Sequence, residues 1–185
     1  MRDFLGNWLA RRRRGVVKPY INGKLLDVGC GFNHLVRDYP GEGVGVDIHQ
    51  WGTVDVLIDD ITNLPFDDNE FDTATLLAVL NQFTEPSAAI QEIGRVVSPK
   101  GFILITMITP FVSKVWRILR SRSDSDQVER KSSPLPTAGF TNRQMRKLLL
   151  SCDFEVVKRV RFMFGLNSLY ICRRVTAKNA AGKAS

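Results

Sequence analysis

Short apolar segments that alternate with helical repeats dominate the first 110 residues of this 185-residue chain. Five of these segments have the length and composition of buried strands: residues 25–28, 44–48, 54–58, 72–77 and 102–108. Between the last two, Pro86 opens a stretch in which Ile90, Ile93 and Val97 repeat at helical spacing, and residues 98–101 have the composition of a turn. Strands that alternate with helices in this way predict a parallel sheet with helices on both faces.

The N-terminal segment has a different pattern. Residues 4–21 predict a mostly helical segment that contains four consecutive arginines, residues 11–14. Gly15 and Pro19 are expected to break its second half, because both residues disfavour a continuing helix.

The rhythm also changes after Pro110. An apolar helical stripe over residues 112–119 is followed by a polar segment. Thr141 and Gln144 form a capping-box signature for a helix that reaches about residue 151. Two further segments, residues 154–162 and 166–173, predict closing strands.

These patterns predict one domain over residues 1–174. Within it we expect a basic helix in residues 1–24 and an inserted segment at residues 111–139. The tail, residues 175–185, is small and polar and is expected to be disordered.

Composition narrows the class of protein. With 44% hydrophobic and 24% charged residues, the chain has the make-up of a globular protein. Its longest apolar run, residues 102–112, is well short of the ~20 residues that a membrane span needs. Arginines follow Ala10, where a secretory signal would place its apolar core, so a cytoplasmic location is expected. The three cysteines have neither metal-ligand nor disulfide spacing, and no metal site is predicted.

Charge is unevenly distributed along the chain. Residues 1–24 hold seven Lys/Arg and one acidic residue, residues 25–110 hold three and thirteen, and residues 111–185 hold sixteen and five. The net charge of +7 therefore combines an acidic middle with two basic ends. Such asymmetry indicates that the ends and the middle of the chain have different roles.

The stretch "LLDVGCGFNHL", residues 25–35, carries the first sign of chemistry. A strand that turns into a helix at Gly29 and Gly31 brings bare backbone up to a ligand at the carboxyl edge of the sheet, where nucleotides bind. Asp47 follows Asp27 by twenty positions and ends the next strand, where a carboxylate can bind a ribose diol. His34 stands where a dinucleotide fingerprint needs its third glycine, which disfavours a nicotinamide cofactor.

Four motifs resemble those of class I S-adenosylmethionine-dependent methyltransferases of the small-molecule type: "LLDVGCG", "GVGVD", "DDITNLPFDDNEFDTATLLAVLNQF" and "EIGRVVSPKGFILITM". Their order and spacing match over about residues 20–110. The resemblance implies an α/β fold with a doubly wound, Rossmann-like sheet of seven strands. That sheet would be mostly parallel, with an antiparallel last strand and helices on both faces.

The resemblance also implies a cofactor, S-adenosyl-L-methionine, which is converted to S-adenosyl-L-homocysteine. The residues that would meet its methionine part are Asp27, Gly29, Cys30, Gly31 and Leu77. Asp47 would hold the ribose hydroxyls, with Ile48 beside the adenine. Asp60 would meet the adenine amino group, and Ile61 would make the neighbouring backbone contact.

Two positions depart from the family pattern. Asn33 stands where many relatives have a third glycine, and asparagine tolerates the left-handed backbone that such a turn needs. Gln82 stands where relatives often have histidine, and an amide cannot take up a proton at neutral pH. We therefore assign no catalytic base.

The resemblance implies methyl transfer by in-line displacement to an acceptor that the sequence does not name. The basic residues in and around the insertion favour an anionic small molecule, sugar or lipid, and they leave peripheral membrane contact open. A non-catalytic S-adenosylmethionine-binding or regulatory protein is the main alternative. A methyltransferase that acts on nucleic acid is disfavoured, because the arginine run lacks interleaved aromatic residues beyond Trp8. The oligomeric state is not predicted.

Overall fold

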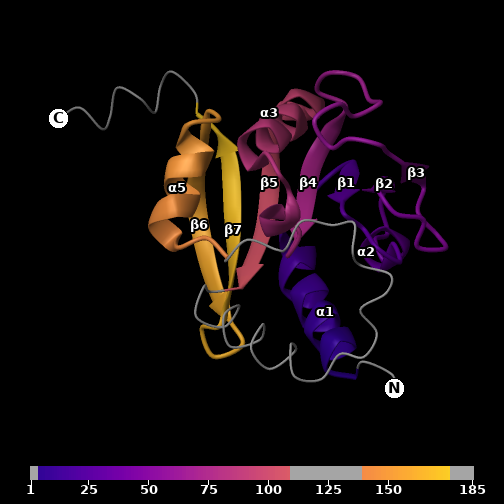
Figure 1. Cartoon of the computed structure of the whole chain (residues 1–185), viewed down its shortest axis with the longest axis horizontal. Helices are drawn as coiled ribbons and strands as arrows, with labels where there is room; N and C mark the ends of the chain where they lie inside the picture. The colour runs from indigo at the N-terminus through magenta and orange to yellow at the C-terminus, as the bar shows by residue number, and fades with distance from the viewer. Residues whose placement is uncertain (1–3, 109–138, 176–185) are drawn as a thin grey trace.

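A computed structural model describes residues 4–108 and 139–175 of the chain (Figure 1). The predicted acceptor-site insertion, except Gly139, and the predicted disordered tail, except Val175, lie outside these described residues. The backbone N–H of Val175 donates to the carbonyl of Asp153 at 2.8 Å, so this residue of the predicted tail is bound to the described fold.

The described residues form one seven-stranded sheet in the order β3-β2-β1-β4-β5-β7-β6. Every neighbouring pair is parallel except the two pairs that β7 makes, with β5 and with β6, so the predicted fold class is confirmed. The strands are β1 Leu25–Val28, β2 Gly43–Asp47, β3 Val56–Leu57, β4 Phe71–Leu77, β5 Val97–Ile108, β6 Phe154–Phe162 and β7 Asn167–Arg174.

Helices cover both faces of the sheet. Alternate strand residues point to opposite sides, so the strands contribute apolar side chains to a core on each face. Ile103 and Tyr170 belong to the core cluster that contains buried residues of α3 and α5. Leu104 and Leu169, one position away on the same strands, pack instead with Val17 at the end of α1. The helical segments are α1 Phe4–Val17, η1 Lys18–Tyr20, α2 His34–Arg37, η2 Leu80–Gln82, α3 Pro86–Val96 and α5 Asn142–Leu150.

The capping box of α5 is confirmed. The backbone N–H of Gln144 donates to Oγ1 of Thr141 at 3.2 Å, and the Thr141 N–H donates to Oε1 of Gln144 at 2.9 Å. This reciprocal pair satisfies N–H groups that have no partner within the helix.

The expected break at Gly15 is wrong, because α1 continues through this residue to Val17. Val16 and Val17 pack on the apolar face of the sheet, and this burial offsets the roughly 1 kcal/mol that glycine costs in a helix. The break at Pro19 is confirmed, since the chain there forms the short 3₁₀ turn η1.

The predicted turn at residues 98–101 is part of β5. The register with β4 moves from Phe71 opposite Val97 to Thr73 opposite Phe102, so four residues of β5 bulge opposite one of β4. A Cβ on Gly101 would lie 2.6 Å from the carbonyl oxygen of Asp72, which explains why the bulge needs glycine there. Turn composition therefore marked a bulge inside a strand.

The parallel strands all end at one edge of the sheet, which we call the carboxyl edge. Figure 1 shows the arrowhead of β5 pointing down to this edge, where α1 also begins. The turn after β1 and the end of β2 lie there side by side, because Val28 pairs with Val46. This edge is the place where the sequence-predicted site residues can meet.

Candidate functional site

The turn after β1 exposes bare backbone at the carboxyl edge. Gly29 and Gly31 have left-handed φ angles of 70° and 55°. The N–H groups of Gly29 and Cys30 both donate to the carbonyl of Val46, at 2.9 and 3.1 Å, which ties the turn to β2. A Cβ on Gly31 would meet no atom within 4 Å, so the space above this residue is open to a ligand.

Asp47 completes this turn from the end of β2. Its Oδ2 accepts a hydrogen bond from the Gly31 N–H at 2.9 Å, and its Oδ1 accepts one from the His49 N–H at 3.0 Å. The carboxylate is largely buried and fixed in position. Each of its oxygens keeps a further lone pair, which is the requirement for binding a diol. Ile48, the next residue, exposes about half of its surface beside this carboxylate.

Asp27 lies at the same edge, inside the protein. Oγ1 of Thr75 donates to its Oδ1 at 2.6 Å. Burial raises the pKa of Asp27 to about 7, even though the Thr75 hydrogen bond and the charge of Arg14 lower it. Burial, with the charges of Asp27 and Asp47, likewise raises the pKa of Cys30 to about 12, so its thiol stays protonated and is a poor nucleophile.

Asn33 joins the turn to the segment that precedes β3. Its φ of 56° confirms that asparagine adopts the left-handed conformation here. Its buried side-chain amide donates to the carbonyl of Thr53 at 3.0 Å and to Oδ2 of Asp55 at 2.7 Å. A Cβ on Gly45 would lie 2.1 Å from the Asn33 Oδ1, so the glycine of "GVGVD" makes room for this side chain.

The remaining predicted residues surround this centre. The N–H of Ile58 donates to the carbonyl of Asp47 at 3.0 Å, which places the loop with Asp60 and Ile61 next to β2. Asp60 is exposed, and its carboxylate accepts the N–H and hydroxyl of Thr62 at 2.8 and 2.7 Å, which lowers its pKa. The structure thus brings Asp27, Gly29, Cys30, Gly31, Asp47 and Ile48 together at the edge, with Asp60 and Ile61 flanking them.

Leu77 lies at the end of β4, as predicted, but its side chain packs in the cluster beneath α1. The next residue, Ala78, has a left-handed φ of 60°, and its N–H donates to the carbonyl of Thr106 at 3.1 Å. Gln82 donates its side-chain amide to the Ala78 carbonyl at 3.3 Å. The residue that replaces the family's histidine therefore helps to hold the end of β4.

An aromatic cluster beside Asp47 was missed by the sequence reasoning. The exposed rings of Phe32 and Trp51 lie 5.8 Å apart, with His34 6.2 Å from Phe32 and His49 5.9 Å from Trp51. The sequence contained a signal for this cluster, because its aromatic residues follow closely after Gly31 and after Asp47. Such flat apolar surfaces suit contact with a planar ring.

Polar groups beneath α1 were also missed. Thr106 on β5 and Asn167 on β7 are buried on the sheet face that α1 covers, near the carboxyl edge. Among the described residues, no partner hydrogen-bonds the Thr106 Oγ1, the Asn167 Oδ1 or the buried Nε of Arg13. Burial also lowers the pKa of Arg13. Unpaired buried polar atoms are uncommon, and each costs about 1–3 kcal/mol.

Two kinds of feature are absent from the described ranges, 4–108 and 139–175. These ranges contain no group of three or more His, Cys, Asp or Glu side chains that could hold a metal ion. They also contain no helix with the length and apolar character needed to cross a membrane.

Comparison with known proteins finds a matching family model and curated relatives. Residues 26–105 match a family model described as a methyltransferase domain. A demethylmenaquinone methyltransferase of Paenarthrobacter aurescens is 30% identical over 133 residues, which cover 63% of this chain and 53% of that protein. One of Corynebacterium kroppenstedtii is 37% identical over 121 residues, covering 58% and 52%. The chain thus spans about half the length of these curated relatives.

Solved structures share the fold at low sequence identity. An S-adenosylmethionine-dependent methyltransferase of Thermotoga maritima superposes with a TM-score of 0.70 at 17% identity and covers 92% of both chains. The 1,6-didemethyltoxoflavin-N1-methyltransferase of Burkholderia thailandensis, solved with S-adenosylhomocysteine, has a TM-score of 0.65 at 17% identity over 95% of this chain and 82% of that chain. At these identities the likeness is one of fold.

Proposed function

We propose that this chain, whose residues 26–105 match a methyltransferase-domain family model, binds S-adenosyl-L-methionine at the carboxyl edge and transfers the methyl group to a small-molecule acceptor. The observation that carries the proposal is the fixed pairing of the Gly31 N–H with the Asp47 carboxylate beside open backbone. The proposed activity is inferred from curated relatives, and this chain matches only about half of their length.

The residues present fit this cofactor. Asp47 keeps free lone pairs for two ribose hydroxyls, and the exposed Ile48 offers apolar surface to the adenine. Gly31 leaves room for the methionine part, and Asp27, once ionised, offers a negative charge to its ammonium group. Asp60 would meet the adenine amino group, and Phe32 and Trp51 add further ring surface next to Asp47.

Bound S-adenosyl-L-methionine supplies a methyl group that is already activated on a sulfonium. The protein then has to align the acceptor in line with the bond that breaks, and to keep water away. In this proposal the acceptor approaches over the carboxyl ends of β4 and β5, on the sheet face that α1 covers. Thr106 and Asn167 are buried there, each with a side-chain oxygen that no described residue hydrogen-bonds.

The curated relatives suggest the class of acceptor. Two are named demethylmenaquinone methyltransferases, and others are named ubiquinone/menaquinone biosynthesis C-methyltransferases. We propose a lipophilic, quinone-type ring as the acceptor of this chain, which agrees with the lipid option in the sequence analysis. The basic residues that favoured an anionic acceptor lie mostly in residues 109–138, outside the described part of the chain.

Calorimetry and turnover together test this proposal. Titration of the purified full chain with S-adenosylhomocysteine should give saturable binding, and NADH should bind more weakly or not at all. Incubation with methyl-labelled S-adenosylmethionine and a demethylated quinol in detergent should then transfer label to the quinol. Binding without transfer to any quinol would favour the non-catalytic alternative, and tighter binding of NADH would contradict the cofactor assignment.

A further inference from the structure

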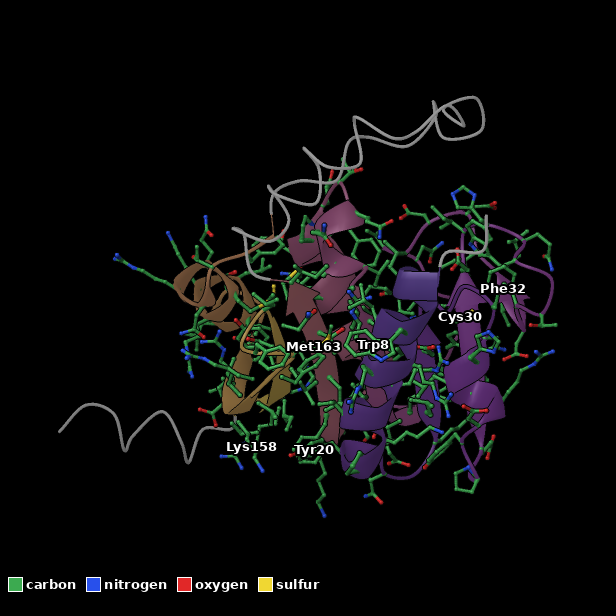
Figure 2. The ribbon with its side chains drawn as sticks, turned by 90° about the horizontal axis from the view of Figure 1, so that it is seen from below. Trp8, Tyr20, Cys30, Phe32, Lys158 and Met163 are labelled. Atoms are coloured by element: carbon green, nitrogen blue, oxygen red, sulfur yellow. The ribbon has the colours of Figure 1, made fainter. Side chains whose placement is uncertain are left out.

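Two large apolar side chains are exposed at the carboxyl edge. Trp8 on α1 exposes 47% of its surface, and Phe164 in the β6–β7 turn is fully exposed. Figure 2 looks onto this edge from below and shows Trp8 beside Met163, the residue that precedes Phe164. Leu166, on the other side of the same turn, is also exposed. The edge therefore carries an apolar surface from two parts of the chain.

The backbone of the β6–β7 turn holds Phe164 outward. Met163 and Phe164 both have left-handed φ angles, 53° and 57°, and Gly165 follows with 80°. Bulky side chains rarely adopt this conformation, because it is sterically strained. The turn is nevertheless fixed, since the Leu166 N–H donates to the Met163 carbonyl at 3.1 Å and the Asn167 amide donates to the Met163 sulfur at 3.4 Å. A strained turn that presents an aromatic side chain to solvent indicates a contact surface.

The same two parts of the chain are basic. Residues 4–21 and 156–171 together contain eight Lys/Arg and no Asp or Glu. Some of these cations have partners within the fold: Lys18 pairs with Asp38 at 3.3 Å, and Arg159 donates to Oγ of Ser168 at 2.8 Å. Arg11, Arg12 and Arg161 are exposed, and the Arg12 guanidinium lies 5.7 Å from the centre of the Trp8 ring.

We propose that this surface docks on an anionic lipid bilayer, with Phe164, Leu166 and Trp8 entering the headgroup region and the arginines binding lipid phosphates. We name it the basic–aromatic edge, and it consists of Trp8, Arg11, Arg12, Arg161, Phe164 and Leu166. Its helical part follows the pattern of interfacial helices, because Trp8, Arg11 and Arg12 share one face of α1 while Val17 packs on the sheet.

Charge and shape favour a bilayer over other occupants. A second copy of this chain would place the same basic surface opposite itself in a symmetric dimer, which like charges oppose. Nucleic acid would match the arginines, and its bases stack on exposed aromatic rings, but it offers no apolar phase for Leu166. Anionic lipid matches both features at once, since its phosphates attract the exposed Lys/Arg and its acyl region accepts the apolar side chains.

Docking at this edge would orient the proposed methyltransferase site toward the lipid. The glycine turn follows β1 at the same carboxyl edge, and Figure 2 labels its Cys30 together with Trp8 and Met163 in the view from below. A quinone-type acceptor could then enter from the membrane without crossing water. The docking itself goes beyond the proposed function and is measured without turnover.

Vesicle co-sedimentation of the full chain tests the proposal. Vesicles of phosphatidylcholine mixed with phosphatidylglycerol should bind the protein, pure phosphatidylcholine should bind it weakly, and salt should reduce the binding. The double variant Arg11→Glu/Arg12→Glu should bind the mixed vesicles about 30-fold more weakly or worse. Phe164→Ser, at a fully exposed position, should weaken binding about tenfold.

Matched variants on α5 serve as controls. Arg143→Glu/Lys147→Glu makes the same charge change at exposed positions, and Leu150→Ser removes an exposed apolar side chain, so both should bind as the parent does. Equal losses in the α5 controls, or no vesicle binding by the parent, would overturn the proposal. Binding of a single-stranded oligonucleotide that the edge variants abolish, without vesicle binding, would assign the edge to nucleic acid instead. Methyl transfer to a detergent-solubilised quinol would survive failure of the docking proposal.

Discussion

The backbone N–H of Gly31 donates to Oδ2 of Asp47 at 2.9 Å, joining two residues that are sixteen positions apart in the chain. This hydrogen bond connects the glycine turn after β1 to the acid at the end of β2. The same carboxylate also accepts the His49 N–H at 3.0 Å, so one side chain holds two loops of the candidate cofactor site. Asp47 therefore has a structural role in addition to its proposed contact with ribose.

Replacement of Asp47 by Ala should weaken S-adenosylhomocysteine binding by about 1.5–3 kcal/mol, the range for hydrogen bonds to charged groups. Calorimetric titration measures this loss, with Asp59→Ala, at an exposed position, as the control. Because Asp47 also holds the loops, the variant should melt at a lower temperature than the control. An unchanged affinity in folded Asp47→Ala would refute the ribose assignment.

Two substitutions in the glycine turn should separate ligand binding from stability. Gly31→Val should abolish cofactor binding, because a β-branched side chain opposes the left-handed φ of 55° and fills the open space above the turn. Asn33→Gly should keep the cofactor affinity, since glycine adopts the same backbone conformation.

The structure adds a cost to Asn33→Gly that the sequence did not indicate. The variant loses the side-chain hydrogen bonds to Thr53 and Asp55, so we expect the free energy of unfolding to fall by about 1–3 kcal/mol. Denaturant titration gives this value. If Asn33→Gly lost more cofactor affinity than Gly31→Val, the turn would not be the methionine-binding element.

Asp27 should make stability depend on pH. Its carboxyl releases a proton near pH 3.8 in the unfolded chain and near pH 7 in the folded protein, because burial disfavours the charge. Between these values the folded state binds more protons, so this group's contribution to stability is full below pH 3.8 and is lost as pH rises through 7. The slope approaches about 1.4 kcal/mol per pH unit.

Comparison of parent and Asp27→Asn by urea titration at several pH values isolates this contribution. The difference in unfolding free energy should shift in favour of Asp27→Asn as pH rises from 4 to 7. Asp59→Asn provides the control at an exposed carboxylate and should leave the parent's pH profile unchanged. A difference between parent and Asp27→Asn that does not vary with pH would show that Asp27 titrates normally.

Two buried threonines should respond oppositely to the same substitution. Thr106→Val removes a buried hydroxyl that no described residue pairs with, so the free energy of unfolding should rise by about 1 kcal/mol. Thr75→Val removes the donor to Asp27 and should lower it by a similar or larger amount. Thermal melts of both variants make the comparison. A fall in methyl transfer by the more stable Thr106→Val would indicate that its hydroxyl contacts the acceptor.

Much of the fold was predictable because local signals agreed with one another. Apolar runs predicted the seven strands to within a few residues, since strand burial on both faces demands such runs. The capping box at Thr141 gave the start of α5, and the glycines with Asp47 predicted the partners that the turn brings together. These features depend on neighbouring residues, or on the fixed geometry of a parallel sheet.

The tertiary structure decided what depends on distant parts of the chain. The sequence determined that Gly31 follows one strand and that Asp47 ends the next, but only the fold shows that Asn33 fills the space left by Gly45 and binds Asp55. Turn composition at residues 98–101 could not reveal a bulge, because the bulge exists only against β4. Nor could local sequence place Trp8 and Phe164 at one edge. They come from opposite ends of the chain, and they meet at this edge because α1 packs on the sheet face formed by β5 and β7.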